Sequence, residues 1–168
     1  LFTPISSTKT YLIDNCGYKV HEWQSEYRPA LSVYLQDDGS VVRTGALQTP
    51  FIGGGTGGRV ECISWEGELK WHFHYSTDDV QQHHDIEVLP NGNVLLIAWE
   101  QLSSEEAIAL GRDPETIGSR LWPDHVVEFD PNEGGTPEIV WEWHVIDHII
   151  QDYDSEKPNY GVVADHPE

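Results

Sequence analysis

Gly58-Arg-Val-Glu-Cys-Ile-Ser-Trp-Glu-Gly-Glu-Leu-Lys-Trp-His-Phe-His74 is followed by His83-His-Asp-Ile-Glu-Val-Leu-Pro-Asn-Gly-Asn-Val-Leu-Leu-Ile-Ala98, and these two stretches decide the fold. The first reads as strand, turn, strand, and the second as strand, Asn-Gly turn, strand. Four strands in about 40 residues is the size of one β-propeller blade. The sequence therefore predicts an all-β fold built from propeller blades.

The same pattern occurs three times, in units that span residues 10–50, 58–102 and 125–168. Large side chains recur at alternate positions of the first hairpin, as one face of a strand requires. The equivalent pairs are His21 with Trp23, Trp71 with Phe73, and Trp141 with Trp143. The turn Asn91-Gly92-Asn93 likewise matches Asp38-Gly39-Ser40. Because the third unit shows no clear second hairpin, the three units are expected to be part of a larger set of stacked repeats.

Residues 103–124 interrupt the repeats as a predicted helical insertion. Ser103 is suited to cap the helix and Glu106 stands at the capping-box position, while Gly111 closes the segment. A second short helix is expected over Val145 to Tyr153, where three isoleucines share one face.

Charge and composition narrow the class of protein. The 168 residues contain 9 Lys and Arg against 29 Asp and Glu, a net charge of −20. Such a chain repels nucleic acid and anionic membranes, and a strongly hydrated surface is typical of secreted or salt-tolerant proteins. No apolar run reaches the ~20 residues of a membrane span. Cys16 and Cys62 are interpreted either as two unpaired cysteines or, in an exported protein, as a disulfide.

Histidine is the residue type through which this chain could carry chemistry, as a nucleophile, a general base or a ligand. His83 and His84 open a strand, and alternation predicts that only one of them faces a channel. The glycine-rich run over residues 53–58 lacks the Lys-Ser/Thr ending of a P-loop and is interpreted as a flexible or tightly turned loop. His144 and His148 stand four residues apart, but they are a strand-end and a helix-start residue rather than one helical face, so no metal and no cofactor are expected.

Four segments carry a resemblance to a known family: Phe51 to Val60, Trp71 to Tyr75, Gln82 to Leu96, and Val140 to Asp154, with Asn159-Tyr-Gly161 and His166-Pro-Glu168 after them. They resemble the arylsulfotransferase family of bacterial β-propellers. The His-His-Asp and Leu-Pro-Asn-Gly-Asn elements are the most specific part of this likeness. The resemblance implies a six-bladed propeller with its active site in the central channel, of which this chain would supply about three blades.

The resemblance also implies an activity: transfer of a sulfuryl group from an aryl sulfate to a phenol through a sulfated histidine, without a nucleotide donor. It suggests His84 as the catalytic residue, with His83 as the neighbouring alternative, and His148, His166 and Arg59 as substrate-binding residues. The nucleophilic histidine of the family is expected in a blade outside this chain, so a second chain or further sequence would be a partner. The expected location is secreted or periplasmic. The alternative is a non-catalytic extracellular propeller that serves as a binding or assembly scaffold.

Overall fold

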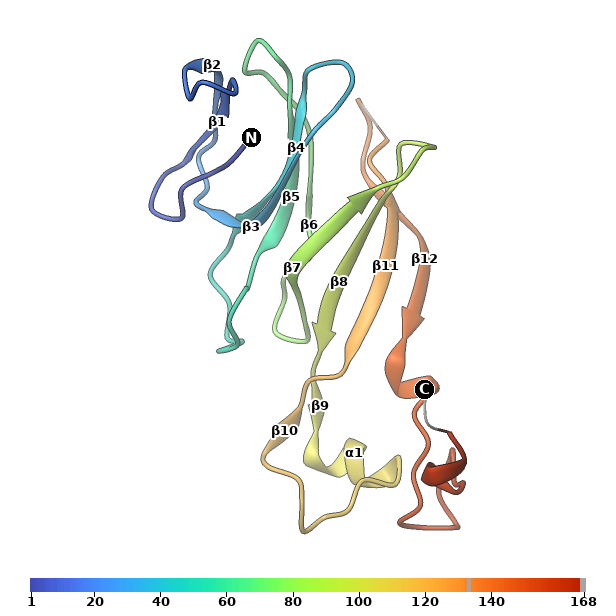
Figure 1. Ribbon diagram of the computed structural model, residues 1–168. Coiled ribbons are helices and arrows are strands. Elements are labelled where there is room, and N and C mark those ends of the chain that lie inside the picture. Colours follow the sequence, from blue (N-terminus) through green and yellow to red (C-terminus); the bar gives the residue numbers. More distant parts are fainter. Residues whose placement is uncertain (133, 167–168) are drawn as a thin grey trace.

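The computed structural model describes residues 1–132 and 134–166 and is almost entirely β-structure (Figure 1). Turns at Asp14–Gly17, Gln36–Gly39, Ser64–Gly67 and Leu89–Gly92 close four of its hairpins, each with a glycine at positive φ. The main strands are β1 (Lys9–Ile13), β2 (Lys19–Gln24), β3 (Pro29–Leu35), β4 (Val41–Ala46), β5 (Gly58–Ile63), β6 (Leu69–His74), β7 (Val80–Val88), β8 (Val94–Glu100), β11 (Asp124–Asp130) and β12 (Glu138–His144).

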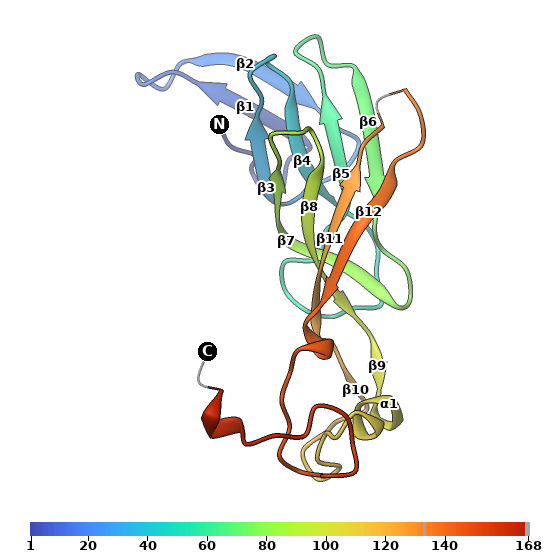
Figure 2. The ribbon, with the colours of Figure 1, turned by 90° about the vertical axis from the view of Figure 1, so that its right-hand side faces the viewer.

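These strands form a two-stranded hairpin and two four-stranded antiparallel sheets. β1 pairs with β2, the first large sheet has the order β3-β4-β5-β6, and the second has the order β7-β8-β11-β12. Each large sheet is therefore a meander in which strands that follow one another along the chain lie side by side. The prediction of an all-β fold is confirmed. Figure 1 shows the β1-β2 hairpin, the first large sheet and the second large sheet in succession from left to right, and in Figure 2 the second sheet lies in front of the first.

The sheets divide the chain at different points from the predicted units. The hairpin β5-β6 belongs with β3-β4, and β7-β8 belongs with β11-β12, so the expected unit 58–102 is split between two sheets. The six backbone pairs between β4 and β5, from Val41↔Ile63 to Ala46↔Gly58, hold the long connection 47–57 within one sheet. From 145 to 166 the described chain adds two 3₁₀ turns and no further hairpin. Residues 167–168 of the expected third unit lie outside the described residues.

The core lies between the two large sheets. Phe129 of β11 is fully buried, its ring centroid 4.3 Å from that of Phe73 and 6.0 Å from that of Trp71. Apolar side chains from β4, β5, β7 and β8 complete this layer: Val42, Val60, Cys62, Ile86, Val94, Leu96 and Ala98. Burial of this apolar surface is the main force that joins the two sheets.

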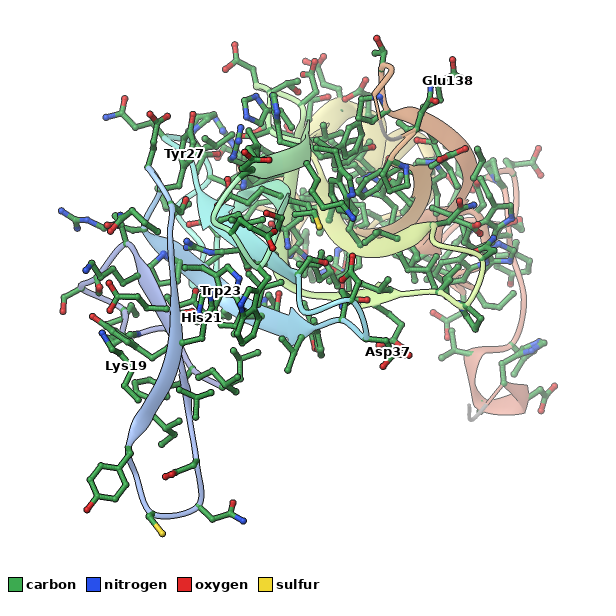
Figure 3. The ribbon with its side chains drawn as sticks, turned by 90° about the horizontal axis from the view of Figure 1, so that it is seen from above. Lys19, His21, Trp23, Tyr27, Asp37 and Glu138 are labelled. Atoms are coloured by element: carbon green, nitrogen blue, oxygen red, sulfur yellow. The ribbon has the colours of Figure 1, made fainter. Side chains whose placement is uncertain are left out.

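A smaller core joins the β1-β2 hairpin to the first large sheet. Trp23 is 1% exposed and packs on Val41 and Ile63. His21 and Trp23 lie on the side of the hairpin that faces this sheet (Figure 3). Trp71 and Phe73 have the same relation to the second sheet. In both layers, therefore, the aromatic side chains of a last strand pack on the sheet that follows in the chain.

The outer face of the second sheet carries two tryptophans and several aliphatic side chains. Register places Trp143 beside Val126 and Ile97, and Trp141 beside Glu128 and Leu95, on the face turned away from Phe129. Trp141, at the repeat position of Trp71, is 47% exposed. No described residue covers it in the way that Phe129 covers Trp71.

The predicted helical insertion is confirmed. A short ribbon of β9 (Leu102–Ser103) and β10 (Arg120–Leu121) carries α1 (Ser104–Ala109) away from the end of the second sheet. Ser103 caps α1 and Glu106 completes the capping box. The second expected helix is shorter than predicted, with one 3₁₀ turn over Val145–Asp147.

Two further expectations concern the cysteines and the membrane. Cys16 is exposed at the β1-β2 turn, whereas Cys62 is buried in β5, and no disulfide joins them. In the described part of the chain, no helix has the length and apolar character needed to cross a bilayer.

Candidate functional site

A bulge in β7 brings His83 and His84 together. β7 pairs with β8 at Gln82↔Ala98 and again at Ile86↔Leu96, so three residues of β7 stand opposite one residue of β8. His84 adopts φ 52°, which L-residues rarely do, and its N–H donates to the Gly55 carbonyl. The expectation that alternation sends the two imidazoles to opposite faces is therefore wrong: their Nδ1 atoms lie 2.9 Å apart. Bulges often re-aim side chains in this way beside active sites.

The glycine-rich loop lies against this bulge, which explains its composition. A Cβ on Gly53 would strike the Trp99 ring, one on Gly55 would come within 2.6 Å of the His84 ring, and one on Gly57 would strike Gln82. Gly55 also has φ 77°. The prediction of a tightly turned loop is confirmed, and its glycines permit a close approach to the histidines.

A hydrogen-bonded chain runs from Asp124 through His83 to His84. His83 Nε2 lies 3.1 Å from Asp124 Oδ1, and its Nδ1 faces His84 Nδ1. A carboxylate only accepts, so His83 must donate from Nε2, and neutral His83 then accepts at Nδ1 from His84. This assignment leaves Nε2 of His84 unprotonated. His84 is exposed to solvent, and no described residue forms a hydrogen bond to that nitrogen.

The surroundings of His83 keep its imidazole neutral. Burial lowers the pKa of His83, and the nearby carboxylate of Asp124 opposes this effect. The ring stacks on Trp99 at 4.1 Å, and Phe51 and Trp122 extend the aromatic cluster. The site therefore combines a shielded imidazole with an accessible one, which is the arrangement of an oriented general base.

Asp85 does not orient either histidine. Its Oδ1 accepts a 2.8 Å hydrogen bond from the hydroxyl of Tyr34 in the neighbouring sheet. This bond raises the pKa of Tyr34 to about 12. The carboxylate that contacts the histidines is that of Asp124, 41 residues after His83, and the sequence offered no local signal for it.

A second histidine cluster lies at the same end of this sheet. Glu100 ends β8, His125 lies near the start of β11, and His144 ends β12, so pairing of the three strands brings them together. His144 Nδ1 lies 3.0 Å from Glu100 Oε2, and His125 Nε2 lies 2.9 Å from the hydroxyl of Tyr75. One ligand atom of each residue of the Glu100–His125–His144 cluster lies within 4.8 Å of the others. These are the described residues best placed to hold a metal.

The other predicted site residues lie in separate surroundings. Arg59 is buried, with its Nε 2.7 Å from Glu61 Oε2, an NH group 2.7 Å from His74 Nε2, and its guanidinium 4.4 Å from the Tyr27 ring centroid. These contacts engage the Arg59 guanidinium within the first large sheet. His148 stacks on Trp143, and His166 is an exposed residue at the end of a 3₁₀ turn. The structure joins only His83 and His84 of the five predicted residues.

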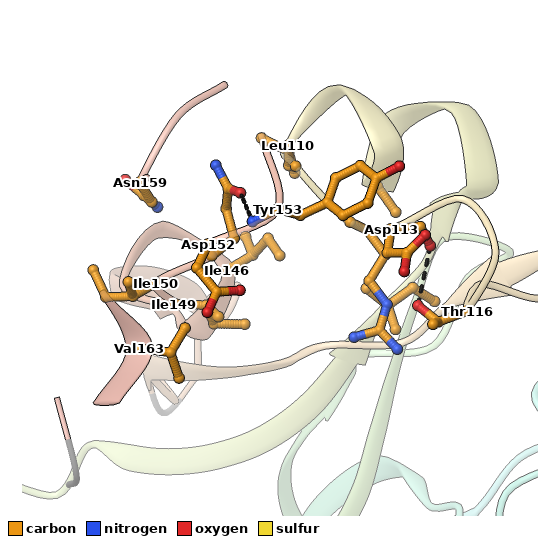
Figure 4. A pocket seen from close by; sticks show the side chains of 15 residues that line it. Leu110, Asp113, Thr116, Ile146, Ile149, Ile150, Asp152, Tyr153, Asn159 and Val163 are labelled. Carbon is orange, nitrogen blue, oxygen red and sulfur yellow. Dashed lines mark hydrogen bonds between the residues drawn. The ribbon is translucent and has the colours of Figure 1, made fainter. Parts of the chain in front are cut away.

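A pocket of about 270 Å³ lies between α1 and the C-terminal segment (Figure 4). Its walls are mainly apolar and include Leu110, Ile146, Ile149, Ile150, Tyr153 and Val163. None of the predicted site residues lines it. This pocket could hold an apolar group, but it lacks the histidines needed for transfer chemistry.

Comparison with known proteins assigns no relative. No protein-family model matches the chain, and no curated protein is similar to it.

Proposed function

We propose that this chain forms part of a β-propeller that transfers a sulfuryl group from an aryl sulfate to a phenol. The observation that carries the proposal is the Asp124–His83–His84 chain, which presents an unprotonated nitrogen to solvent. The likeness of the His-His-Asp segment to arylsulfotransferases supplies the reaction class.

In the proposed reaction, His84 is the proton-transfer group. A histidine elsewhere in the propeller attacks sulfur, its new N–S bond forms, and the S–O bond to the departing phenolate breaks. The acceptor phenol then attacks sulfur, the N–S bond breaks, and Nε2 of His84 takes the phenolic proton. Asp124 stabilises the positive charge that develops on the imidazole pair, as a carboxylate does behind a catalytic histidine.

The remaining blades are proposed partners of the apolar outer face. Trp141 repeats the position of Trp71, whose ring packs on the next sheet, and an adjoining blade would cover Trp141 in the same way. The cation that holds the sulfate oxygens would also come from those blades, because Glu61 and His74 occupy Arg59.

The test is release of nitrophenol from a nitrophenyl sulfate by the assembled protein. Release that requires added phenol, and that His84→Ala abolishes, supports sulfuryl transfer. His72→Ala is a matched control, because His72 is exposed on β6 and outside the site. Release without phenol would indicate a sulfatase. No release would leave the alternative, a non-catalytic extracellular scaffold.

The Asp124→Asn variant tests whether activity depends on the orientation that Asp124 gives the two imidazoles, and not only on their presence. An amide at this position can donate to His83 Nε2 and thereby reverse the hydrogen-bond chain, so that His84 Nε2 carries the proton. We expect a loss of activity comparable to that of His84→Ala, with normal folding, because Asp124 is half exposed.

A further inference from the structure

We infer that the Glu100–His125–His144 cluster is a binding site for a divalent transition cation of the zinc type. Two imidazoles and one carboxylate are a common protein ligand set for Zn²⁺, with one position left for water. The inference concerns residues outside the Asp124–His83–His84 chain and is independent of the proposed sulfuryl transfer.

Two unsatisfied buried atoms point to a missing ligand. Nδ1 of His125 and Oε1 of Glu100 are both buried, and neither makes a hydrogen bond of good geometry, although the Ala98 backbone lies close to the His125 ring. His125 is fully buried, so its free nitrogen has no access to bulk solvent. Leaving such atoms unpaired destabilises a fold, and two of them in one three-residue cluster suggest that both serve a common ligand.

The outer contacts orient His125 as they orient a metal-binding histidine. Its Nε2 lies 2.9 Å from the Tyr75 hydroxyl, which can accept the Nε2–H and leave the Nδ1 lone pair free. A metal-binding histidine typically donates its second ring N–H to such a partner.

His144 is the third ligand, and a metal ion could replace the proton that lies between His144 and Glu100. His144 Nδ1 and Glu100 Oε2 already face each other at 3.0 Å, close to the separation of two donors on one tetrahedral ion. His125 and His144 are neighbours across β11 and β12, with parallel rings 5.0 Å apart. One ligand atom of His125 lies within 4.8 Å of those of Glu100 and His144, so small shifts of the side chains would let one ion contact all three residues.

The place of the cluster in the fold suggests what the metal does. Glu100 is the last residue of β8, before the insertion, and His125 is the second residue of β11, after the insertion. A cation shared with His144 of β12 would close the base of the insertion and fix the ends of three strands. Its effect should therefore appear in stability as well as in metal content.

The test is zinc titration of the full chain, free of any polyhistidine tag and stripped with a chelator, followed by equilibrium dialysis. We expect one Zn²⁺ per chain and a rise in the melting temperature on binding. His144→Ala is the first variant, because this side chain is one-third exposed and its loss spares the core. It should weaken binding by at least about 100-fold, the upper range seen when outer contacts alone are removed.

Four further variants locate the site. Glu100→Gln should weaken binding as His144→Ala does, and Tyr75→Phe should weaken it by about 10-fold through loss of orientation. His84→Ala and His72→Ala should retain full binding, since these histidines lie outside the cluster. Absence of stoichiometric binding by the folded chain would overturn the inference. Equal affinity in the His144→Ala and unmodified chains, or loss in His84→Ala, would overturn it as well.

Discussion

Replacing Phe129 by alanine should lower the free energy of unfolding by about 3–5 kcal/mol, the range for deleting a buried phenylalanine ring. Phe129 is fully buried between the two large sheets, and its ring meets Phe73 at 4.3 Å and Trp71 at 6.0 Å. The substitution therefore removes apolar burial and leaves a cavity in the layer that joins the sheets. With a urea dependence of about 2 kcal/mol per molar, the unfolding midpoint should fall by about 1.5–2.5 M.

The matched control is Trp141→Ala in the same chain. Trp141 occupies the repeat position of Trp71, but it lies on the outer face of the second sheet and is 47% exposed. Its replacement should cost less than about 1 kcal/mol, as for most exposed positions. Urea titration followed by circular dichroism measures both variants. A loss below about 1 kcal/mol for Phe129→Ala would refute the packing of the two sheets through this residue.

Three other predictions follow from local features. Gly55→Ala should destabilise the chain by about 1–2 kcal/mol through its positive φ, and displace the His84 ring by contact, which chemical shifts of that imidazole would report. Because burial lowers the pKa of His83, the unfolded state takes up its proton first below about pH 6.5. The stability that neutral His83 contributes is therefore present above about pH 6.5 and is lost as the pH falls from there through the folded pKa. On acidification, the melting temperature of His83→Gln should fall less than that of the unmodified chain. Ser103→Ala should remove the cap of α1, cost about 1 kcal/mol, and speed amide exchange there about 5-fold; unchanged exchange would contradict the cap.

The strands and turns could be predicted from sequence because their signals are local. Alternation of Trp71 and Phe73 with polar residues marks one strand, and Asn91-Gly92 marks a hairpin turn. The grouping of hairpins into sheets could not be predicted, because each hairpin could pair with the hairpin before it or with the one after it. The backbone pairing of β4 with β5 across residues 47–57 decides it.

The site was partly predictable for the same reason. His83 and His84 are adjacent in sequence and drew attention as a pair, whereas Asp124 approaches them only through the pairing of β8 with β11. The bulge that turns both imidazoles together depends on contact with the glycine-rich loop. The Glu100–His125–His144 cluster likewise arises from strand register, so no spacing along the chain reveals it.

The acceptor dependence of the proposed sulfuryl transfer tests the role of His84 most directly. A phenol that is neutral at the assay pH must lose a proton as it attacks sulfur, whereas a more acidic phenol is already ionised. His84→Ala should therefore slow transfer to the neutral acceptor by about 10²–10⁴-fold, the usual contribution of a general base, and slow transfer to the ionised acceptor far less. An equal loss with both acceptors, or no loss with either, would contradict the assignment of His84 Nε2 as the proton acceptor.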